Sequence, residues 1–425
     1  MNEQALSLPE APGKDQSLDE GRTTGSEFSR RIMLRLLSGL SHGRLTIHEN
    51  GIRQAFGSGS LDIHVTIHEP GAWNAIAFNG SVGAGESYMA GQWDCDDLVG
   101  LVRLLLRNRD ILDRMDRGWV RLVMPLRRIR HWLNQNNRRG SRRNIAAHYD
   151  LGNEFYQLWL DPTMMYSCAF YEREDMELHQ ASIAKLDRIC KALDLRPEDH
   201  LLEIGTGWGG LALHAAGRYG CRVTSVTLSH RQYQLATERI RHYGLSDRVE
   251  IRLCDYRDLE GQYEKLVSVE MIEAVGAENL NTYFRQCGRL LKPDGLMFLQ
   301  AITIADQRYE QALGEVDFIQ KHIFPGGFLP SVQAMSAAMA RASDLRMVWL
   351  DDIGPHYART LQGWRERFVD QIHAVRLLGF DDRFIRMWLF YFCYCEGGFH
   401  ERDLGAVQML LAKPRWHVTP PPAFS

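Results

Sequence analysis

The stretch Leu201-Leu-Glu-Ile-Gly-Thr-Gly-Trp-Gly-Gly210 decides the fold of this chain. Apolar residues lead directly into Gly205, three more glycines follow within five residues, and a helix-like segment covers residues 211–219. A buried parallel strand that turns abruptly into a helix needs such glycines for the tight turn and for close approach to a ligand. The N-terminus of the helix then offers free N–H groups to an anionic or polar ligand. On its own, this pattern is a nucleotide-loop signal that dehydrogenases share.

Apolar runs alternate with helix-length segments after this loop. Short β-rich runs in this arrangement predict an α/β fold with a doubly wound parallel sheet. With Leu201–Ile204, the chain has seven candidate strands, and the other six cover residues 222–228, 249–254, 265–271, 296–304, 345–353 and 406–412. This order resembles the seven-stranded class I methyltransferases, which bind S-adenosylmethionine (SAM).

The end of the second strand argues against a nicotinamide enzyme. A dehydrogenase places a carboxylate there to hold the ribose of NAD, whereas this chain has Thr227-Leu-Ser-His-Arg-Gln232. Asp255 closes the third run, where such methyltransferases usually contact the adenine. Glu203 at the end of the first strand has a simpler interpretation as a helix cap, and Asp255 and Asp258 could be turn formers.

Length and composition set further limits. A chain of 425 residues with 45% hydrophobic content is ordinary for a soluble protein of two or three domains. No apolar stretch reaches the roughly 20 residues that span a bilayer, and the polar N-terminus is not a secretory signal. Eight scattered cysteines without close CxxC pairs indicate reduced thiols in a cytoplasmic protein and no metal site.

A basic belt lies between Leu101 and Arg143. It contains thirteen arginines against three aspartates, which gives a local net charge of +10 although the whole chain carries −3. Apolar residues such as Trp119 and Trp132 are interleaved, so part of the belt could form a basic amphipathic helix on an anionic lipid surface. A solvated linker and a nucleic-acid site are the alternatives.

The sequence predicts four parts. Residues 1–27 are rich in Pro, Gly, Ser and acidic residues and are predicted to be a disordered tail. Residues 28–109 form a small α+β domain, with predicted strands at Leu45–His48, Leu61–Ile67 and Trp73–Phe78. A basic linker follows at 110–143, and residues 144–425 form the catalytic domain.

Several motifs outside the glycine loop carry a closer resemblance. They lie at Asn144–Asn153, Asp161–Phe170, Val269–Gly276 and Ile323–Ser331. Together they resemble the cyclopropane fatty acid synthase family, which includes the mycolic acid cyclopropane synthases. Gly83–Trp93 resembles the signature of the lipid-engaging N-terminal domain in the phospholipid-modifying members. Because the motifs occur in the family's order, the resemblance covers most of the chain.

The resemblance implies that the protein adds a methylene bridge from SAM across a cis double bond of an unsaturated phospholipid acyl chain. An isolated alkene is a weak nucleophile, so the methyl group must be held close to it in a dry site. Methyl transfer leaves a carbocation, which aromatic faces can stabilise by about 2 kcal/mol when desolvated. The candidate aromatic residues are Tyr171, Phe318, Tyr357, Tyr394 and Phe399, although each taken alone is more typical of a core residue.

In this family a bound bicarbonate is thought to remove the last proton. The resemblance places its contacts at the backbone of Cys168, at Glu273, at the backbone of Ile302 and at Tyr357. The histidine of the fifth-strand motif is Gln300 here, and the histidine that often follows the glutamate is Ala274. A glutamine amide can donate a hydrogen bond to an anion but cannot carry charge. Glu270 is an additional carboxylate to which the sequence assigns no role.

If deprotonation occurred at a neighbouring carbon, the product would be a methylene- or methyl-branched chain, which is the alternative function. For the cofactor, the resemblance implies contacts at several positions, and Tyr149 is expected to belong to a segment that folds over it. The implied SAM contacts are Tyr166, Ser167, Gly205 and Gly207, Thr227 and Gln232 at the ribose, and Asp255 and Tyr256 near the adenine.

The sequence therefore predicts a cytoplasmic enzyme, peripherally associated with the inner face of the membrane, with SAM and bicarbonate as cofactors. Family members are often dimers, so a homodimer is expected. Two other classes of protein are less consistent with the sequence: the intact glycine loop argues against a catalytically inactive lipid-binding protein, and the motifs do not support an RNA methyltransferase. No nucleic-acid partner is predicted.

Overall fold

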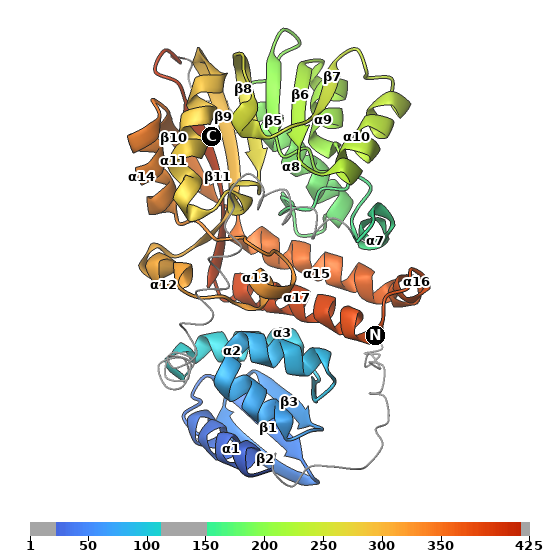
Figure 1. The fold of residues 1–425 in the computed structure, drawn as a ribbon, viewed down its shortest axis with the longest axis vertical. Helices are drawn as coiled ribbons and strands as arrows, with labels where there is room; N and C mark the ends of the chain where they lie inside the picture. Colours follow the sequence, from blue (N-terminus) through green and yellow to red (C-terminus); the bar gives the residue numbers. More distant parts are fainter. Residues whose placement is uncertain (1–22, 112–150, 418–425) are drawn as a thin grey trace. The chain divides into compact units, whose positions relative to one another are not determined.

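A computed structural model describes residues 23–111 and 151–417 (Figure 1). Nearly all of the predicted disordered tail, most of the basic belt, and the motif segment with Tyr149 lie outside these residues. Contacts within the chain define two units, one made of residues up to 125 together with 372–397, the other of residues 126–371 together with 398–425. The predicted division differs at two points, because it assigned 372–397 to the catalytic domain and because helix α1 (Thr23–Leu37) already begins before residue 28.

The second unit contains the predicted seven-stranded sheet, and all seven predicted strands are confirmed. Their order in the sheet is β10-β11-β9-β8-β5-β6-β7 (Figure 1). The sheet is not wholly parallel, because β11 runs antiparallel to both of its neighbours. The strands are β5 (His200–Ile204), β6 (Arg222–Thr227), β7 (Val249–Leu253), β8 (Tyr263–Val269), β9 (Leu291–Ile304), β10 (Arg346–Asp352) and β11 (Leu404–Ala412).

Helices cover both faces of this sheet. Successive side chains of a strand point to opposite faces, so Leu201 packs toward α8, α9 and α10, while Leu202 packs toward α11 and α14. Both leucines are fully buried. The helices of this unit are α7 (Asn153–Trp159), α8 (Leu178–Ala192), α9 (Gly210–His214), α10 (His230–His242), α11 (Leu280–Leu290), α12 (Tyr309–Leu313), α13 (Phe318–His322), α14 (Val332–Ala342) and α15 (Gly354–Asp370).

The glycine loop joins β5 to α9 as predicted. Gly205, Gly207 and Gly209 have φ values of 103°, 52° and 83°, a region that side-chain-bearing residues rarely adopt. A Cβ atom on Gly210 would lie 2.5 Å from the carbonyl oxygen of Thr163, so this position needs glycine for close packing. Helix α9 continues as a π-helical turn over Ala215–Tyr219, and the helix predicted for 211–219 is therefore confirmed.

The first unit contains a four-stranded sheet in the order β2-β1-β3-β4. Predicted strands at 45–48 and 61–67 are confirmed as β1 (Gly43–Glu49) and β3 (Asp62–Ile67), while β2 (Ile52–Ser58) and β4 (Trp93–Cys95) were not predicted. The helices of this unit are α1, α2 (Gly71–Met89), α3 (Leu98–Arg107), α16 (Ile372–Leu377) and nearly all of α17 (Asp382–His400).

The strand predicted at Trp73–Phe78 is wrong, because these residues form part of α2. The six-residue alternation is too short to separate strand from helix, and the two alanines in it favour a helix. Trp73 is buried and donates from Nε1 to Oε1 of Glu49 at 2.7 Å, which fixes the first turns of α2 on the sheet. Helix α2 is kinked at Gly80, whose φ is 53°.

Candidate active site

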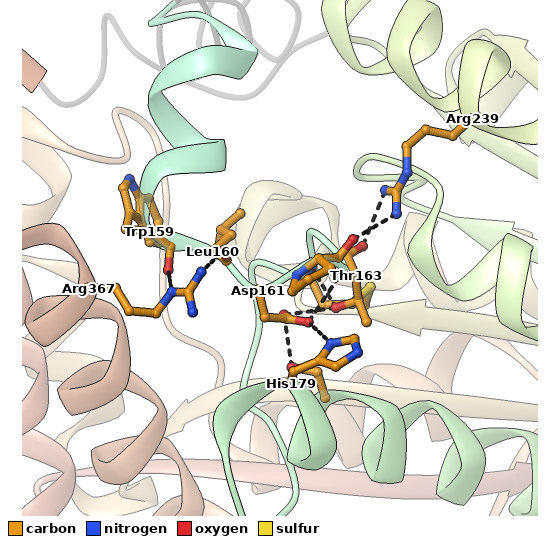
Figure 2. Close-up of polar contacts among 10 residues, drawn as sticks. Trp159, Leu160, Asp161, Thr163, His179, Arg239 and Arg367 are labelled. Carbon is orange, nitrogen blue, oxygen red and sulfur yellow. Dashed lines mark hydrogen bonds and ion pairs between the residues drawn. The ribbon is translucent and has the colours of Figure 1, made fainter. Parts of the chain in front are cut away.

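The turn that leads to the predicted cofactor residues 166 and 167 is held by two arginines (Figure 2). Arg367 on α15 donates to the carbonyl oxygens of Trp159 at 3.0 Å and Leu160 at 2.9 Å. Arg239 on α10 donates to the carbonyl oxygen of Thr163 at 3.3 Å. Two helices that are distant in sequence therefore fix the same short turn, since each guanidinium satisfies carbonyl groups that no helix or strand uses.

A buried carboxylate completes this turn from within (Figure 2). Asp161 accepts hydrogen bonds from the backbone N–H and hydroxyl of Thr163, both at 2.9 Å, and from Ser182 at 3.0 Å. Its other contact is Nδ1 of His179 at 2.9 Å. Each carboxylate oxygen therefore has two hydrogen-bond partners, which fixes the conformation of the turn. Residues 164–168 continue from this fixed turn.

Ser167, a predicted cofactor contact, is paired with a lysine that the sequence did not reveal. Lys185 on α8 is fully buried and donates from Nζ to the Ser167 hydroxyl at 2.6 Å. Burial lowers the pKa of Lys185, because the charged form is poorly solvated, while nearby Glu270 acts in the opposite direction. The predicted neighbour Tyr166 lies in an aromatic cluster, with its ring 5.2 Å from those of Trp159 and Trp364.

Glu203 stabilises the end of β5 through hydrogen bonds and does not cap a helix. Its Oε2 accepts from the Ser225 hydroxyl at 2.5 Å, and the same hydroxyl lies 2.7 Å from the Thr206 hydroxyl. Burial raises the pKa of Glu203 to about 8. This network joins β5, β6 and the glycine loop, so it fixes the backbone of Gly205 and Gly207, where the cofactor is predicted to bind.

The two predicted ribose contacts lie together at the end of β6. The Thr227 hydroxyl donates to Oε1 of Gln232 at 2.8 Å, and both residues are buried. Ser229 caps the N-terminus of α10 by accepting from the backbone N–H of Gln232. The structure therefore brings these side chains to the carboxyl end of the sheet, beside the glycine loop.

Asp255 and Tyr256 follow β7, as predicted. Both carboxylate oxygens of Asp255 are engaged by the side chain of Arg257, at 2.9 and 2.6 Å. Asp255 also accepts from the backbone N–H of Arg257, which is a turn-forming contact. The ring of Tyr256 meets that of Tyr283 edge-on at 5.7 Å. These contacts position both residues, and their role at the adenine stays a prediction.

Three of the predicted bicarbonate contacts converge on one point, which is the carboxylate of Glu270. The backbone N–H of Cys168 and Nε2 of Gln300 donate to Oε1, at 2.9 and 2.8 Å. The Tyr357 hydroxyl donates to Oε2 at 2.6 Å. Glu270 thus fills the hydrogen-bonding positions that the resemblance assigned to a bound anion. We call these three donors the anion cradle.

A second glutamine sets the orientation of the first. Gln408 on β11 lies opposite Gln300 on β9 and donates to its Oε1 at 2.9 Å. The amide nitrogen of Gln300 therefore points away from Gln408, toward Glu270 and the carbonyl oxygen of Cys168 at 3.3 Å. The antiparallel placement of β11 supplies this contact, which the sequence did not reveal.

Glu273, the predicted catalytic glutamate, lies in a separate position. Its Oε1 accepts from the backbone N–H of Ile302 at 2.6 Å, so these two predicted residues are together. Its Oε2 is buried and has no hydrogen-bond partner among the described residues. Burial, followed by the negative charge of Glu270, raises the pKa of Glu273 to about 8. An unpartnered oxygen on a buried carboxyl group marks a place for a ligand.

The predicted aromatic residues lie in four different settings. Tyr357 and Phe399 stack with ring centroids 4.4 Å apart, next to the anion cradle. Tyr171 does not fit the prediction, because the guanidinium of Arg359 already lies over its ring at 4.0 Å. Phe318 is fully buried, and Tyr394 belongs to the first unit.

Comparison with known proteins identifies the family to which the chain belongs. Residues 136–409 match the family described as mycolic acid cyclopropane synthetase. The chain belongs to this family. It is 42% identical to the tuberculostearic acid methyltransferase UfaA1 of Mycobacterium tuberculosis, over 82% of each chain. It is also 36% identical to the cyclopropane-fatty-acyl-phospholipid synthase of Escherichia coli, over 84% of this chain and 89% of that protein.

Solved structures agree with the fold. The mycolic acid cyclopropane synthase CmaA1, in complex with S-adenosylhomocysteine and CTAB, matches 64% of this chain and 98% of its own, with 30% identity and a TM-score of 0.60. The cyclopropane synthase MmaA2 from Mycobacterium tuberculosis matches equally well, at 29% identity. The family member described here is a SAM-dependent methyltransferase of the cyclopropane synthase type, with the class I fold.

Proposed function

We propose that this enzyme transfers the methyl carbon of SAM to the cis double bond of an unsaturated phospholipid acyl chain. The observation that carries the proposal is the carboxylate of Glu270, held by the three donors of the anion cradle in a chain of the cyclopropane synthase family. A buried base next to an aromatic pair suits a reaction that passes through a carbocation and ends with loss of a proton. The names of the relatives support a lipid substrate.

The residues suggest how SAM would be held. The glycine loop would lie against it, because a Cβ on Gly207 would meet no atom within 4 Å, which leaves the backbone open to a ligand. Ser167, Thr227 and Gln232 would contact the polar parts of the cofactor. SAM supplies an electrophilic methyl group, and the π electrons of the alkene form the new carbon–carbon bond as the sulfur–carbon bond breaks toward sulfur.

The fate of the resulting carbocation sets the product. If a base removes a proton from the transferred methyl group, the C–H electron pair closes a cyclopropane ring. In the alternative, a hydride shift precedes the loss of a proton from the transferred carbon and gives a methylene branch, and a saturated methyl branch would then need a hydride from a separate reductant and a proton. The similarity to a methyltransferase named for tuberculostearic acid supports this alternative.

The resemblance implies bicarbonate as the base. Oε2 of Glu273 offers one contact for such an ion, since it has no partner among the described residues, whereas the backbone N–H of Ile302 is engaged by Oε1 of the same residue. The other expected donors, on Cys168, Gln300 and Tyr357, are engaged by Glu270. The chain's own carboxylates are therefore an alternative source of the base.

The first unit and the basic belt would bring the enzyme to its substrate. None of the helices in the described ranges 23–111 and 151–417 is long and apolar enough to cross a membrane. We propose that the net charge of +10 between residues 101 and 143 attracts the chain to anionic headgroups at the inner face of the membrane, from where one acyl chain enters the site. Association as a homodimer is carried over from the family.

Product analysis tests the proposal. Purified enzyme is incubated with methyl-labelled SAM and vesicles of a cis-monounsaturated phosphatidylglycerol, and the fatty acids are identified by mass spectrometry and NMR before and after hydrogenation. A cyclopropane lacks olefinic protons and resists mild hydrogenation. A methylene branch has olefinic protons and is hydrogenated under the same conditions. Vesicles of a fully saturated lipid are the control. The proposal fails if the enzyme binds SAM but leaves the unsaturated chains unlabelled.

A further inference from the structure

Glu270 is the residue of the site for which neither the sequence nor the family resemblance gives a role. It lies directly after β8, at the carboxyl end of the central strands. Its side chain is partly buried, and the carboxylate accepts hydrogen bonds from the backbone of one loop, from β9 and from α15. We propose that Glu270 is the enzyme's own base, replacing an external anion in the deprotonation that ends the reaction. This inference rests on the proposed function.

The donors of the anion cradle can serve only one acceptor at a time. The backbone N–H of Cys168 and the hydroxyl of Tyr357 each carry a single hydrogen, and both point at Glu270. The amide of Gln300 is held in the same direction by Gln408. A bicarbonate ion in the cradle would have to displace the Glu270 side chain, so the two bases exclude each other there.

The backbone conformation of Glu270 is strained, so holding the carboxylate in this position costs conformational energy. Its φ is 49°, in the left-handed region where glycine is at ease and residues with a Cβ are strained. The backbone N–H of Glu270 donates to the carbonyl oxygen of Gln300 at 2.8 Å, which ties the strained residue to β9. Strain of this kind persists where surrounding structure fixes it, and it gathers at functional sites.

The charges around Glu270 fit a base. Lys185 is buried nearby, and its positive charge favours the ionised form of the carboxylate. Burial outweighs this effect and the lowering effect of the hydrogen bonds from Tyr357, Gln300 and Cys168, so the pKa of Glu270 is raised and its carboxylate is a stronger proton acceptor than an exposed glutamate. Burial and the negative charge of Glu270 also raise the pKa of the neighbouring Glu273, to about 8.

The proton transfer is balanced without any further reactant. Oε1 or Oε2 of Glu270 forms a bond to a proton of the transferred methyl group, and the C–H electron pair moves to the cationic carbon to close the ring. Glu270 becomes a neutral carboxylic acid, and the positive charge delivered with the methyl group is thereby removed from the lipid. The proton then passes to solvent when the product leaves.

The test combines two substitutions with control of bicarbonate. The parent enzyme and Glu270→Gln are assayed in buffer purged of carbon dioxide and in buffer with added bicarbonate. We expect parent turnover to be the same in both buffers, and the Gln variant to lose at least about 100-fold in turnover, since general bases contribute roughly this much. SAM affinity, measured by calorimetry, should be retained in the variant, because Glu270 contacts no predicted cofactor residue.

Glu270→Gly gives the complementary result. This change removes the carboxylate, relieves the strained φ and frees the donors of Cys168, Gln300 and Tyr357. We expect it to bind 13C-labelled bicarbonate, detected by NMR, and to regain turnover when bicarbonate is added. The exposed Glu198→Gln is the matched control and should behave as the parent does.

Two results would overturn the inference: a parent enzyme that stops when bicarbonate is removed, or a Glu270→Gln variant with parental turnover. These results differ from failure of the proposed function. In that case the parent enzyme itself would transfer no carbon to unsaturated lipid, with or without bicarbonate.

Discussion

Glu273→Gln tests the electrostatics of the site without any assay of activity. Burial and the charge of Glu270 raise the pKa of Glu273 from its ordinary value of 4.5 to about 8. A group whose pKa is higher in the folded state stabilises the fold least at high pH, so the parent protein loses stability as the pH rises from about 4.5 to about 8. Glutamine has no charge to desolvate and keeps an acceptor for the backbone N–H of Ile302.

The expected size of the effect follows from this difference in pKa. A difference of about 3.5 corresponds to at most about 5 kcal/mol, reached above pH 8 and falling toward zero near pH 4.5. Thermal unfolding of parent and variant is compared at pH 5, 6.5 and 8, with the exposed Glu198→Gln as control. We expect the variant's advantage in Tm to grow at each step, to roughly 10 °C at pH 8.

A variant advantage that does not change with pH would refute the reasoning, because only the titration of Glu273 couples its stability to pH in this way. A second comparison isolates the role of Glu270. In a Glu270→Gln background the charge beside Glu273 is absent, so the pKa of Glu273 should fall and the gain from Glu273→Gln at pH 8 should shrink.

The remaining predictions concern the contacts around the site. Because Glu270 is the proposed base and Glu273 only neighbours it, Glu273→Gln should lower turnover far less than Glu270→Gln does, while SAM affinity, measured by calorimetry, stays nearly unchanged. Tyr357→Phe removes one donor to Glu270 and should lower kcat by about 10-fold or more, with KM for the lipid little changed. Gln408→Leu leaves Oε1 of Gln300 unpartnered and should lower kcat by a similar factor. Arg239→Ala loosens the turn before residue 164 and should weaken SAM binding by calorimetry, whereas Arg241→Ala on the exposed side of the same helix should not.

The sheet could be predicted from sequence because its strands are short apolar runs between helix-length segments, and the glycine loop marks the first of them. The reversed direction of β11 could not, since apolar content does not encode strand direction. Trp73–Phe78 was misassigned because six alternating residues fit both periods, and the choice depends on the contact of Trp73 with Glu49.

The sequence predicted most of the residues that form the site, but not how their side chains contact one another. Cys168, Gln300 and Tyr357 do meet, yet sequence could not show that Glu270 would occupy the space between them. Glu270 and Glu273 are three residues apart, and the left-handed φ of the first together with the 3₁₀ turn at 272–274 sends their side chains to different partners. The sequence contains no distinctive signal for Lys185, because α8 also carries Arg188 and Lys191, and only the tertiary structure reveals that Lys185 is the fully buried one.

The fate of the transferred carbon tests the central claim most directly. The enzyme is incubated with SAM that carries a trideuterated methyl group and with vesicles of a cis-monounsaturated phospholipid, and the acyl chains are analysed by mass spectrometry. Transfer to the double bond followed by loss of a deuteron from the transferred carbon predicts an acyl chain that has gained one carbon bearing two deuterium atoms. Recovery of unlabelled acyl chains, or of chains that retain all three deuterium atoms, would contradict it.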